Sequence, residues 1–303
     1  MALQTSGAIS FQDINVELKL TPTAQISLDD VPVRKLLDKL TGQISMNDAY
    51  GKASTITYVN SSNIQNANIF KLFGSPTQSG DYVFINNGEI SATTAAFALR
   101  TGVLPAGSTL TIINNGYIRG KAGDSGAFSF AGGPGGHALM LEMNCSLENL
   151  GYIFGGGGGG GGIKRYASAN NAYYIAATGG GGAGFATAAL YANTAVVDPT
   201  YGRVGTDIQP LPGDKNGPGG GGVISANNTN SSAYQDAVYG GDGGQLGQSG
   251  TVGYFLTLGS QGAYKNTTVS SVAGAGGNAI LRNGHTLTQL NTSTANQIKG
   301  LIA

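Results

Sequence analysis

Eight consecutive glycines, Gly155 to Gly162, constrain this chain more than any other part of its sequence. Further glycine clusters surround this run, and 44 of the 52 glycines lie after residue 115. Glycine loses more conformational freedom on folding than any other residue, so an isolated run would be a flexible linker. Extended left-handed helices, which rise about 3.1 Å per residue, can pack side by side where no side chain protrudes. Their backbone groups then hydrogen-bond between neighbours, and we expect a rigid sandwich of such polyglycine II-type helices.

The composition excludes several classes of protein. Charged residues make up 11% of the 303 residues and the formal net charge is zero, so no phosphate-binding surface and no nucleic-acid partner are expected. The chain is 40% hydrophobic, with 14 Tyr and 10 Phe, which favours an ordered protein over a disordered one. The N-terminus lacks a secretion signal and no apolar run approaches the roughly 20 residues of a membrane span. We therefore expect synthesis in a cytoplasm and no membrane insertion.

Catalytic and metal-binding signals are weak. Cys145 is the single cysteine, and its alternating flanks predict a buried small hydrophobe rather than a nucleophile. His137 and His285 lie beside glycines, and no metal-ligand spacing occurs, so no metal or cofactor is expected. A glycan-cleaving depolymerase would need paired carboxylates in one groove. Eight acidic residues follow residue 115, and folding could pair two of them, so hydrolysis stays an alternative to the non-enzymatic reading.

The first 50 residues contain a threefold repeat of the pattern Ile-Ser-apolar-x-Asp. Its copies are residues 9–13, 26–30 and 44–48. Each copy contains Ser-x-x-Asp, close to a capping box that begins a helical turn. Apolar residues at helical spacing after the second copy predict a short amphipathic helix over 28–40. The residues before each cap predict short strands, so this segment is expected to be a small α/β module.

Residues 53–113 have the alternation and the β-branched content of strands, centred on 55–59, 82–85 and 110–113. Asn87-Gly88 and Asn115-Gly116 are tight-turn signals. They belong to a second repeat, whose copies are Ile85–Ile90, Ile113–Ile118, a looser Leu147–Ile153 and a weak copy at 296–300. A further element, Gly-Gly-x-Ala-apolar, occurs at 135–139 and 276–280. A repeated strand, turn, strand and glycine run predicts stacked coils.

These motifs resemble the glycine-rich domains of bacteriophage tail-fibre proteins. The resemblance rests on residues 115–120, on 132–139 and on 150–154 where they lead into the eight-glycine run. The glycine clusters also resemble the adhesins at the fibre tips of T-even-like phages. There, glycine motifs form a lattice of polyglycine II helices and variable loops between them contact the host receptor. The N-terminal residues 14–18 and 25–30 resemble the start of many phage virion proteins, which implies a virion-attachment or oligomerisation role, and phage fibres are usually homotrimers.

The sequence thus predicts a mainly β virion protein with three parts. Residues 1–52 are a virion-attachment module, 53–115 a β-rich neck, and 116–303 a glycine-rich adhesin domain. The predicted function is non-catalytic recognition of a protein or glycan on the bacterial surface by a tail-fibre or tail-tip protein, which is assembled with other tail proteins in the host cytoplasm. The alternative is a structural virion protein, such as a head fibre, collar or decoration protein, without receptor binding.

The candidate contact residues fall in two groups. Tyr, Ser, Gly and Asn dominate the inserts between glycine runs, as they do in recognition loops, and two cations could anchor an acidic surface group. The receptor-binding candidates are Lys164, Arg165, Tyr166, Tyr173, Tyr174, Tyr191, Tyr234 and Tyr239. The resemblance makes the apolar residues of the N-terminal module candidates for virion attachment. These are Phe11, Ile14, Val16, Leu18, Leu28, Val33, Leu36 and Leu37.

Overall fold

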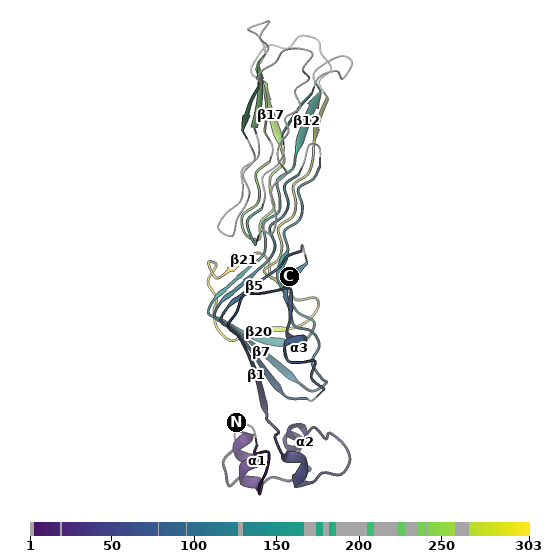
Figure 1. Ribbon diagram of the computed structural model, residues 1–303, viewed down its shortest axis with the longest axis vertical. Coiled ribbons are helices and arrows are strands. Elements are labelled where there is room, and N and C mark those ends of the chain that lie inside the picture. Colours follow the sequence, from purple (N-terminus) through teal and green to yellow (C-terminus); the bar gives the residue numbers. More distant parts are fainter. Residues whose placement is uncertain are drawn as a thin grey trace.

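The protein is elongated, with a helical module at its N-terminal end, a β-rich body in the middle and glycine-rich segments that run away from both (Figure 1). The computed structural model describes most of the chain. The described residues are 3–18, 20–77, 79–94, 96–126, 130–166, 174–177, 182–185, 205–208, 223–227, 235–239, 241–257 and 267–303.

The N-terminal module contains helices α1 (Phe11–Glu17) and α2 (Val31–Leu36) and the 3-10 helix η1 (Met46–Ala49). The described residues of this module include no strand, so the predicted α/β module is all helical. The two or three residues before each cap are too short to pair, and their isoleucines pack on the module core instead. The buried core residues are Leu3, Ile14, Val33, Leu36, Leu37 and Ala49.

The threefold repeat forms the same local hydrogen bond three times. The backbone N–H groups of Ser10, Ser27 and Ser45 each donate to the carboxylate three residues later, at 2.8 Å. Helix α2 is shorter than the predicted span of 28–40. Pro32 fits only the first helical turn, so the helix begins at Val31, and a left-handed residue at φ 55°, Asp38, follows its end.

The body is a stack of coils. Each of the first four coils supplies one strand to each of three parallel sheets, and the last coil supplies strands to two of them. One sheet has the order β1-β4-β7-β10-β20, a second β2-β5-β8-β11-β21 and a third β19-β9-β6-β3. The body is therefore a parallel β-helix. The strands of the first sheet are β1 (Thr55–Asn60), β4 (Asp81–Asn86), β7 (Thr109–Asn114), β10 (Cys145–Asn149) and β20 (Leu287–Gln289).

The other two sheets have shorter strands. In the second sheet they are β2 (Ile64–Gln65), β5 (Glu89–Ser91), β8 (Tyr117–Arg119), β11 (Tyr152–Phe154) and β21 (Ile298–Lys299). In the third they are β3 (Ala67–Asn68), β6 (Phe97–Arg100), β9 (His137–Met140) and β19 (Ile280–Leu281). One further helix, α3 (Ile69–Leu72), follows β3. The inward-facing aliphatic and aromatic side chains of successive coils stack into one hydrophobic core.

An asparagine ladder runs through the interior, at the corner between the first and second sheets. The Nδ2 atom of Asn60 donates to Oδ1 of Asn86, Asn86 donates to Asn114, and Asn114 donates to Asn149, each at 2.8 Å. All four residues are buried. The repeat read from the sequence is thus confirmed as stacked coils, and its asparagines satisfy one another's amide groups where the chain turns.

The corner glycines Gly88, Gly116 and Gly151 are required by close stacking rather than by a special backbone angle. A Cβ atom on Gly116 would lie 2.0 Å from the carbonyl oxygen of Gly88, and one on Gly151 would lie 2.1 Å from that of Gly116. Neither Gly88 nor Gly116 has a positive φ. The turn signals therefore mark corners at which the chain passes to the next sheet, and the strands on either side do not form hairpins.

Two excursions from the β-helix build the glycine-rich part. Residues 120–136 connect β8 to β9, and residues 155–279 connect β11 to β19. The strands therefore continue through the predicted boundary at residue 115, with β7 before it and β8 after it in the same coil. The two Gly-Gly-x-Ala-apolar copies meet where the chain re-enters the body, because Leu139 pairs with Ile280.

Gly155–Gly162 forms the centre of a bundle, and its contacts repeat every three residues. The N–H groups of Gly156, Gly159 and Gly162 donate to carbonyls of residues 136, 133 and 130. Carbonyls of the run accept from other neighbours with the same spacing, such as Gly157 from residue 123 and Gly160 from residue 126. Six described segments surround the run. They are residues 120–126, 130–136, 182–183, 241–244, 248–251 and 271–277.

The far end of the bundle carries two antiparallel sheets (Figure 1). One has the order β13-β12-β18 and the other β14-β15-β16-β17. The strands are β12 (Ile163–Tyr166), β13 (Tyr174–Ala177), β18 (Thr267–Ser270), β14 (Gly205–Ile208), β15 (Val223–Asn227), β16 (Gln235–Tyr239) and β17 (Tyr254–Thr257).

Candidate functional site

The receptor-binding candidates that the structure describes lie on strands at the end of the molecule farthest from the N-terminal module (Figure 1). Lys164, Arg165 and Tyr166 lie on β12, and the strand register sets Tyr166 opposite Tyr174 of β13. The structure thus brings four of the eight candidates onto one pair of strands. Tyr173, Tyr191 and Tyr234 lie outside the described residues.

Tyr239 is the candidate whose side chain the structure describes. It is the last residue of β16, and it is the cross-strand partner of Tyr254 on β17. The two rings are stacked, with centroids 4.7 Å apart and an angle of 6° between their planes. Tyr254 lies on the edge strand of its sheet and is 54% exposed. Such a pair offers a rigid aromatic surface at a low conformational cost.

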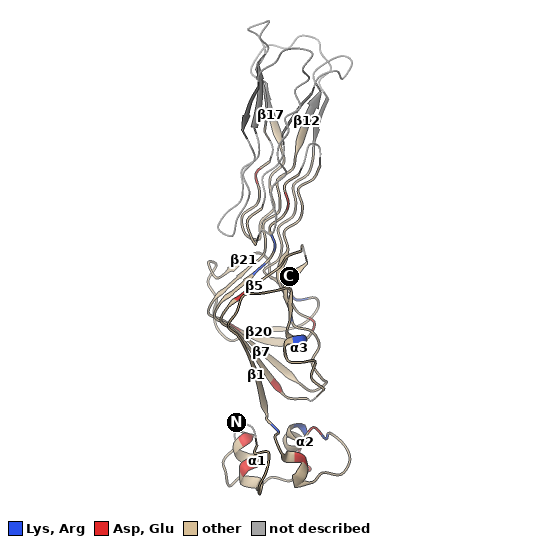
Figure 2. Ribbon diagram, in the orientation of Figure 1, with Lys and Arg blue, Asp and Glu red and all other residues tan. Residues whose placement is uncertain are grey.

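The pairing of Tyr239 with Tyr254 was missed by the sequence reasoning, because their partnership depends on a register between strands. Charged side chains are sparse along the glycine bundle and gather on the helices of the N-terminal module (Figure 2). The described part of the glycine bundle therefore presents few charged groups.

The virion-attachment candidates divide by burial. Four of them belong to the core of the module, namely Ile14, Val33, Leu36 and Leu37. Two others, Leu18 and Leu28, are partly buried and pack against this core. The exposed members are Phe11, at 44% exposed, and Val16, at 50%. The buried residues can serve attachment only by shaping the module. Four further apolar residues are exposed there and were missed, namely Leu20, Val31, Leu40 and Tyr50.

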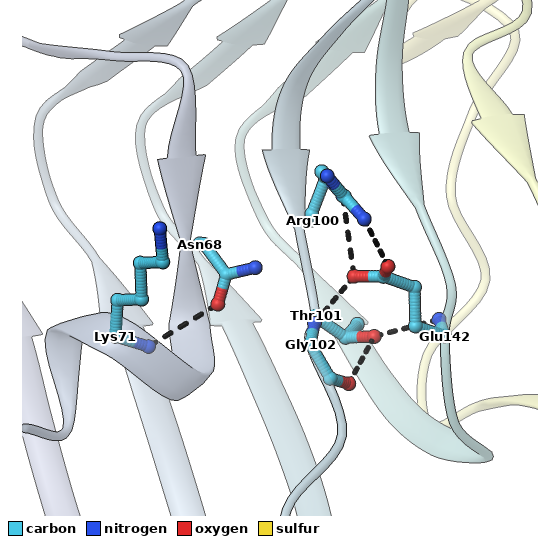
Figure 3. Close-up of polar contacts among 6 residues, drawn as sticks. All are labelled: Asn68, Lys71, Arg100, Thr101, Gly102 and Glu142. Carbon is cyan, nitrogen blue, oxygen red and sulfur yellow. Dashed lines mark hydrogen bonds and ion pairs between the residues drawn. The ribbon is translucent and has the colours of Figure 1, made fainter. Parts of the chain in front are cut away.

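The acidic residue best defined by the structure has a structural task. Glu142 accepts hydrogen bonds from Arg100 and from the Gly102 N–H at 2.9 Å, and its own N–H donates to Thr101 Oγ1 at 2.8 Å (Figure 3). This contact joins β6 to the turn after β9. Nearby, Asn68 caps α3 by accepting from the Lys71 N–H at 3.2 Å (Figure 3). Glu142 is therefore fully used in holding two coils together.

Cys145 and His137 also have structural surroundings within the β-helix. Burial raises the pKa of the Cys145 thiol to about 12, so the buried thiol stays protonated and unreactive at neutral pH. Within the described residues no group of three or more His, Cys, Asp or Glu side chains could hold a metal ion. His137 is stacked on Phe97, with ring centroids 5.3 Å apart, and its Nδ1 atom accepts from the Asn278 N–H at 2.8 Å.

The partly buried position of His137 leads us to expect that the stability of the protein depends on pH. Burial lowers its pKa, and protonation would remove the acceptor for the Asn278 N–H. The unfolded chain binds a proton near pH 6.5, whereas the folded chain binds it only at lower pH, so stability is lost as the pH falls below about 6.5. We expect the melting temperature to drop between pH 7.5 and 5.5, and to drop less in His137→Gln. Equal drops in both proteins would contradict a role for His137.

Comparison with known proteins places this arrangement in a family. The family described as "Phage tail fibre adhesin Gp38" matches residues 53–302, which covers the β-helix and the glycine bundle. The chain therefore belongs to the Gp38 family of phage tail fibre adhesins. A search of curated proteins found no match.

A solved structure shares the overall fold. It is the crystal structure of the gp37-gp38 adhesin tip complex of the bacteriophage S16 long tail fiber, and it matches with a TM-score of 0.53 and 18% identity. The match covers 98% of this chain and 100% of that chain. The resemblance to phage fibre adhesins is thereby confirmed. In the described part of the chain, no helix is both long enough and apolar enough to span a membrane.

Proposed function

We propose that this protein is the receptor-binding tip of a phage tail fibre and that it recognises a bacterial surface protein or glycan without chemistry. The observation that carries this proposal is the separation of its two ends. The N-terminal module lies at one end, and the strands that bear the receptor-binding candidates lie at the other, with the β-helix and glycine bundle between them (Figure 1). Membership of a tail fibre adhesin family supports the same reading.

We infer that the glycine bundle consists of polyglycine II helices. Contacts of Gly155–Gly162 recur every three residues, the repeat of that helix. A Cβ atom on any of Gly155 to Gly161 would clash with a backbone carbonyl group of a neighbouring segment. The backbone groups of the run also form hydrogen bonds with several neighbouring segments. Such a bundle is stiff because its backbone groups are satisfied by surrounding segments. It can therefore hold variable loops far from the virion without a hydrophobic core of its own.

The partner at the N-terminal end is proposed to be another tail-fibre protein. The related structure is a complex of two proteins, gp37 and gp38, and the module of this chain exposes Phe11, Val16, Val31 and Leu40. Exposed apolar residues gathered on one small module are typical of an interface. Homotrimerisation stays a prediction, which sedimentation can test. The core of the β-helix and the centre of the glycine bundle are each completed within one chain.

Adsorption competition tests the function. The full-length protein should be used, because strands after residue 136 complete sheets that begin with β1, β2 and β3. We expect purified protein, added to host cells before phage, to block adsorption. Folded protein that neither binds cells nor blocks phage would support a structural virion component instead. Release of soluble sugar from capsule or lipopolysaccharide would support a depolymerase.

Substitution of two tyrosines tests the proposed contact surface. Tyr173→Ala with Tyr174→Ala should weaken adsorption competition at least tenfold, because a contacting aromatic residue at the centre of an interface often contributes 2 kcal/mol or more. The matched control is Tyr117→Ala with Tyr152→Ala. That pair is exposed and stacked, with centroids 4.9 Å apart, and it lies on the β-helix. Equal competition by both folded double variants and the wild type would place the receptor contact elsewhere.

A further inference from the structure

A cavity lies where the N-terminal module meets the β-helix. Its volume is about 290 Å³, and it lies at the N-terminal ends of the first-sheet strands. The module contributes the apolar residues Leu18, Val31, Pro32 and Leu36, together with Lys35. The opposite wall consists of residues 79–81 and Gly107. The cavity is large enough for the end of a peptide. Its module side is mainly apolar, and its β-helix side carries polar groups.

Charged and polar groups of the cavity suit a peptide end. Lys35 lines it, with its Cε atom 3.9 Å from the Cβ position of Gly107, so the side chain reaches from α2 toward the β-helix. Among the described residues, no carboxylate lies within ion-pair distance of Lys35. Asp81 also lines the cavity, and its Oδ1 atom accepts from the Thr109 hydroxyl at 2.8 Å.

Ser79 adds an unmet hydrogen-bonding demand. This lining residue is 8% exposed, and its hydroxyl has no hydrogen-bond partner within the described part of the chain. A buried hydroxyl without a partner lowers stability, and most such groups in folded proteins are satisfied. A guest that brings main-chain donors and acceptors into the cavity would remove this deficit.

The two walls of the cavity are held in a fixed relation. Glu17, at the end of α1, is buried and accepts from the Ser54 N–H at 3.0 Å, and the Ser54 hydroxyl donates to the Glu17 carbonyl at 2.7 Å. Ser54 in turn accepts from the Asp81 N–H at 3.0 Å. The module is therefore clamped to β4 beside the cavity, and the site is formed before any guest arrives.

We propose that this cavity captures the C-terminal residue of a partner tail-fibre chain. The terminal carboxylate pairs with Lys35, a main-chain N–H of the guest donates to Asp81, and an aliphatic terminal side chain packs on Leu18, Pro32 and Leu36. An internal segment would leave Lys35 unpaired, and a cationic side chain would be repelled by it. Chains of a fibre end at its tip, so a protein that is attached to the tip can contact a chain end. The inference rests on the proposed attachment role of the module and deepens it.

Peptide binding to the full-length protein tests the proposal. The probe is acetyl-Gly-Gly-Leu as the free acid, compared with its C-terminal amide, and saturation-transfer NMR reports binding up to about 5 mM. We expect the acid to bind with a Kd of about 1 mM or tighter and the amide about tenfold more weakly, because a charge-assisted hydrogen bond is lost. Acid and amide that bind equally, or an acid that does not bind at all, would overturn the proposal.

Three variants locate the site. Lys35→Met keeps the aliphatic stem and should weaken the acid about tenfold, whereas Lys71→Met, which removes an exposed lysine on α3, should change nothing. Val31→Glu alters a residue that is 65% exposed at the start of α2, where an acid suits the helix dipole, so it should fold and also weaken the acid. Unaltered binding by Lys35→Met and Val31→Glu would overturn the site. All three should still block phage adsorption, which separates failure here from failure of receptor binding.

Discussion

Alanine in place of Gly158 is expected to unfold the glycine bundle. The added Cβ atom would lie 1.9 Å from the carbonyl oxygen of Gly274 and 2.4 Å from its carbonyl carbon. Both atoms are backbone, so no side-chain rotation relieves the clash. The glycine run is held in place by hydrogen bonds to two neighbouring segments. The Gly274 N–H donates to the Gly159 carbonyl at 2.8 Å, and the Gly158 N–H donates to the Gln248 carbonyl at 2.9 Å, so the run cannot move away from the clash without breaking such bonds.

The expected cost is at least about 4 kcal/mol in the free energy of unfolding of the bundle, in the range reserved for severe core defects. Limited proteolysis should cut Gly158→Ala within residues 155–279 under conditions in which the wild type resists, and adsorption competition should be lost. Gly80→Ala is the matched control. Its Cβ atom would lie 3.4 Å from the Cδ1 atom of Ile56, 3.8 Å from the Cε2 atom of Tyr82 and 3.9 Å from the Ser54 carbonyl oxygen, which are all ordinary contacts. Resistance of Gly158→Ala equal to that of Gly80→Ala would show that the glycine run is not packed on its neighbours.

The coils of the β-helix could be predicted because their signal is local and repeated. The Asn-Gly corners recur at the same place in two successive coils. The strands predicted at 55–59, 82–85 and 110–113 are confirmed as β1, β4 and β7. The prediction of short strands in the N-terminal module is wrong for its described residues. There the capping motifs decide the structure, since each serine and aspartate pair stabilises a helical turn.

The return of the chain to the β-helix could not be predicted from local pattern. β19 pairs with β9 and β21 pairs with β11 across more than a hundred intervening residues. A strand's own residues show its periodicity but not its partner. The sequence carried two hints, the second Gly-Gly-x-Ala-apolar copy at 276–280 and the weak copy of the Asn-Gly repeat at 296–300, because similar sequences suit the same position in the stack. This is why the predicted boundary at residue 115 falls within a coil of the β-helix.

The candidate sites show the same division between local and long-range information. Apolar residues at helical spacing identify the face of a helix that is buried, so the candidates Ile14, Val33 and Leu37 form the module core. The exposed residue Val31 breaks that spacing and was not among the candidates. The cavity at the module junction combines residues from five separate stretches of chain, so no local sequence pattern predicts it.

Replacement of one ladder asparagine by aspartate should also lower the stability of the protein strongly. Asn114 accepts from Asn86 and donates to Asn149, both at 2.8 Å, and it is fully buried. In Asn114→Asp the carboxylate still accepts from Asn86, but its second oxygen faces the Asn149 oxygen with no proton between them. We expect the free energy of unfolding at pH 7 to fall by about 3 kcal/mol or more, because a buried charge is left without a partner.

The control for this variant is its neighbour. Asn115 donates to Asn87 Oδ1 at 2.8 Å in a parallel arrangement that is exposed to solvent, so Asn115→Asp should cost no more than about 1 kcal/mol. Denaturant unfolding of both variants and the wild type measures the difference. Equal costs would show that the interior ladder contributes no more than a surface contact.

The deficit of Asn114→Asp should shrink in acid, which distinguishes a charge effect from a packing defect. Burial without a cation raises the pKa of the new carboxyl above its unfolded value of about 3.9. Between the unfolded and folded pKa values the folded chain binds more protons, so stability relative to Asn115→Asp falls as the pH rises through that window. Once protonated, the acid can donate to Asn149 and rebuild the ladder. A deficit of the same size at pH 7 and pH 5 would mean that the lost stability comes from altered packing of the coil corner instead of from the missing proton.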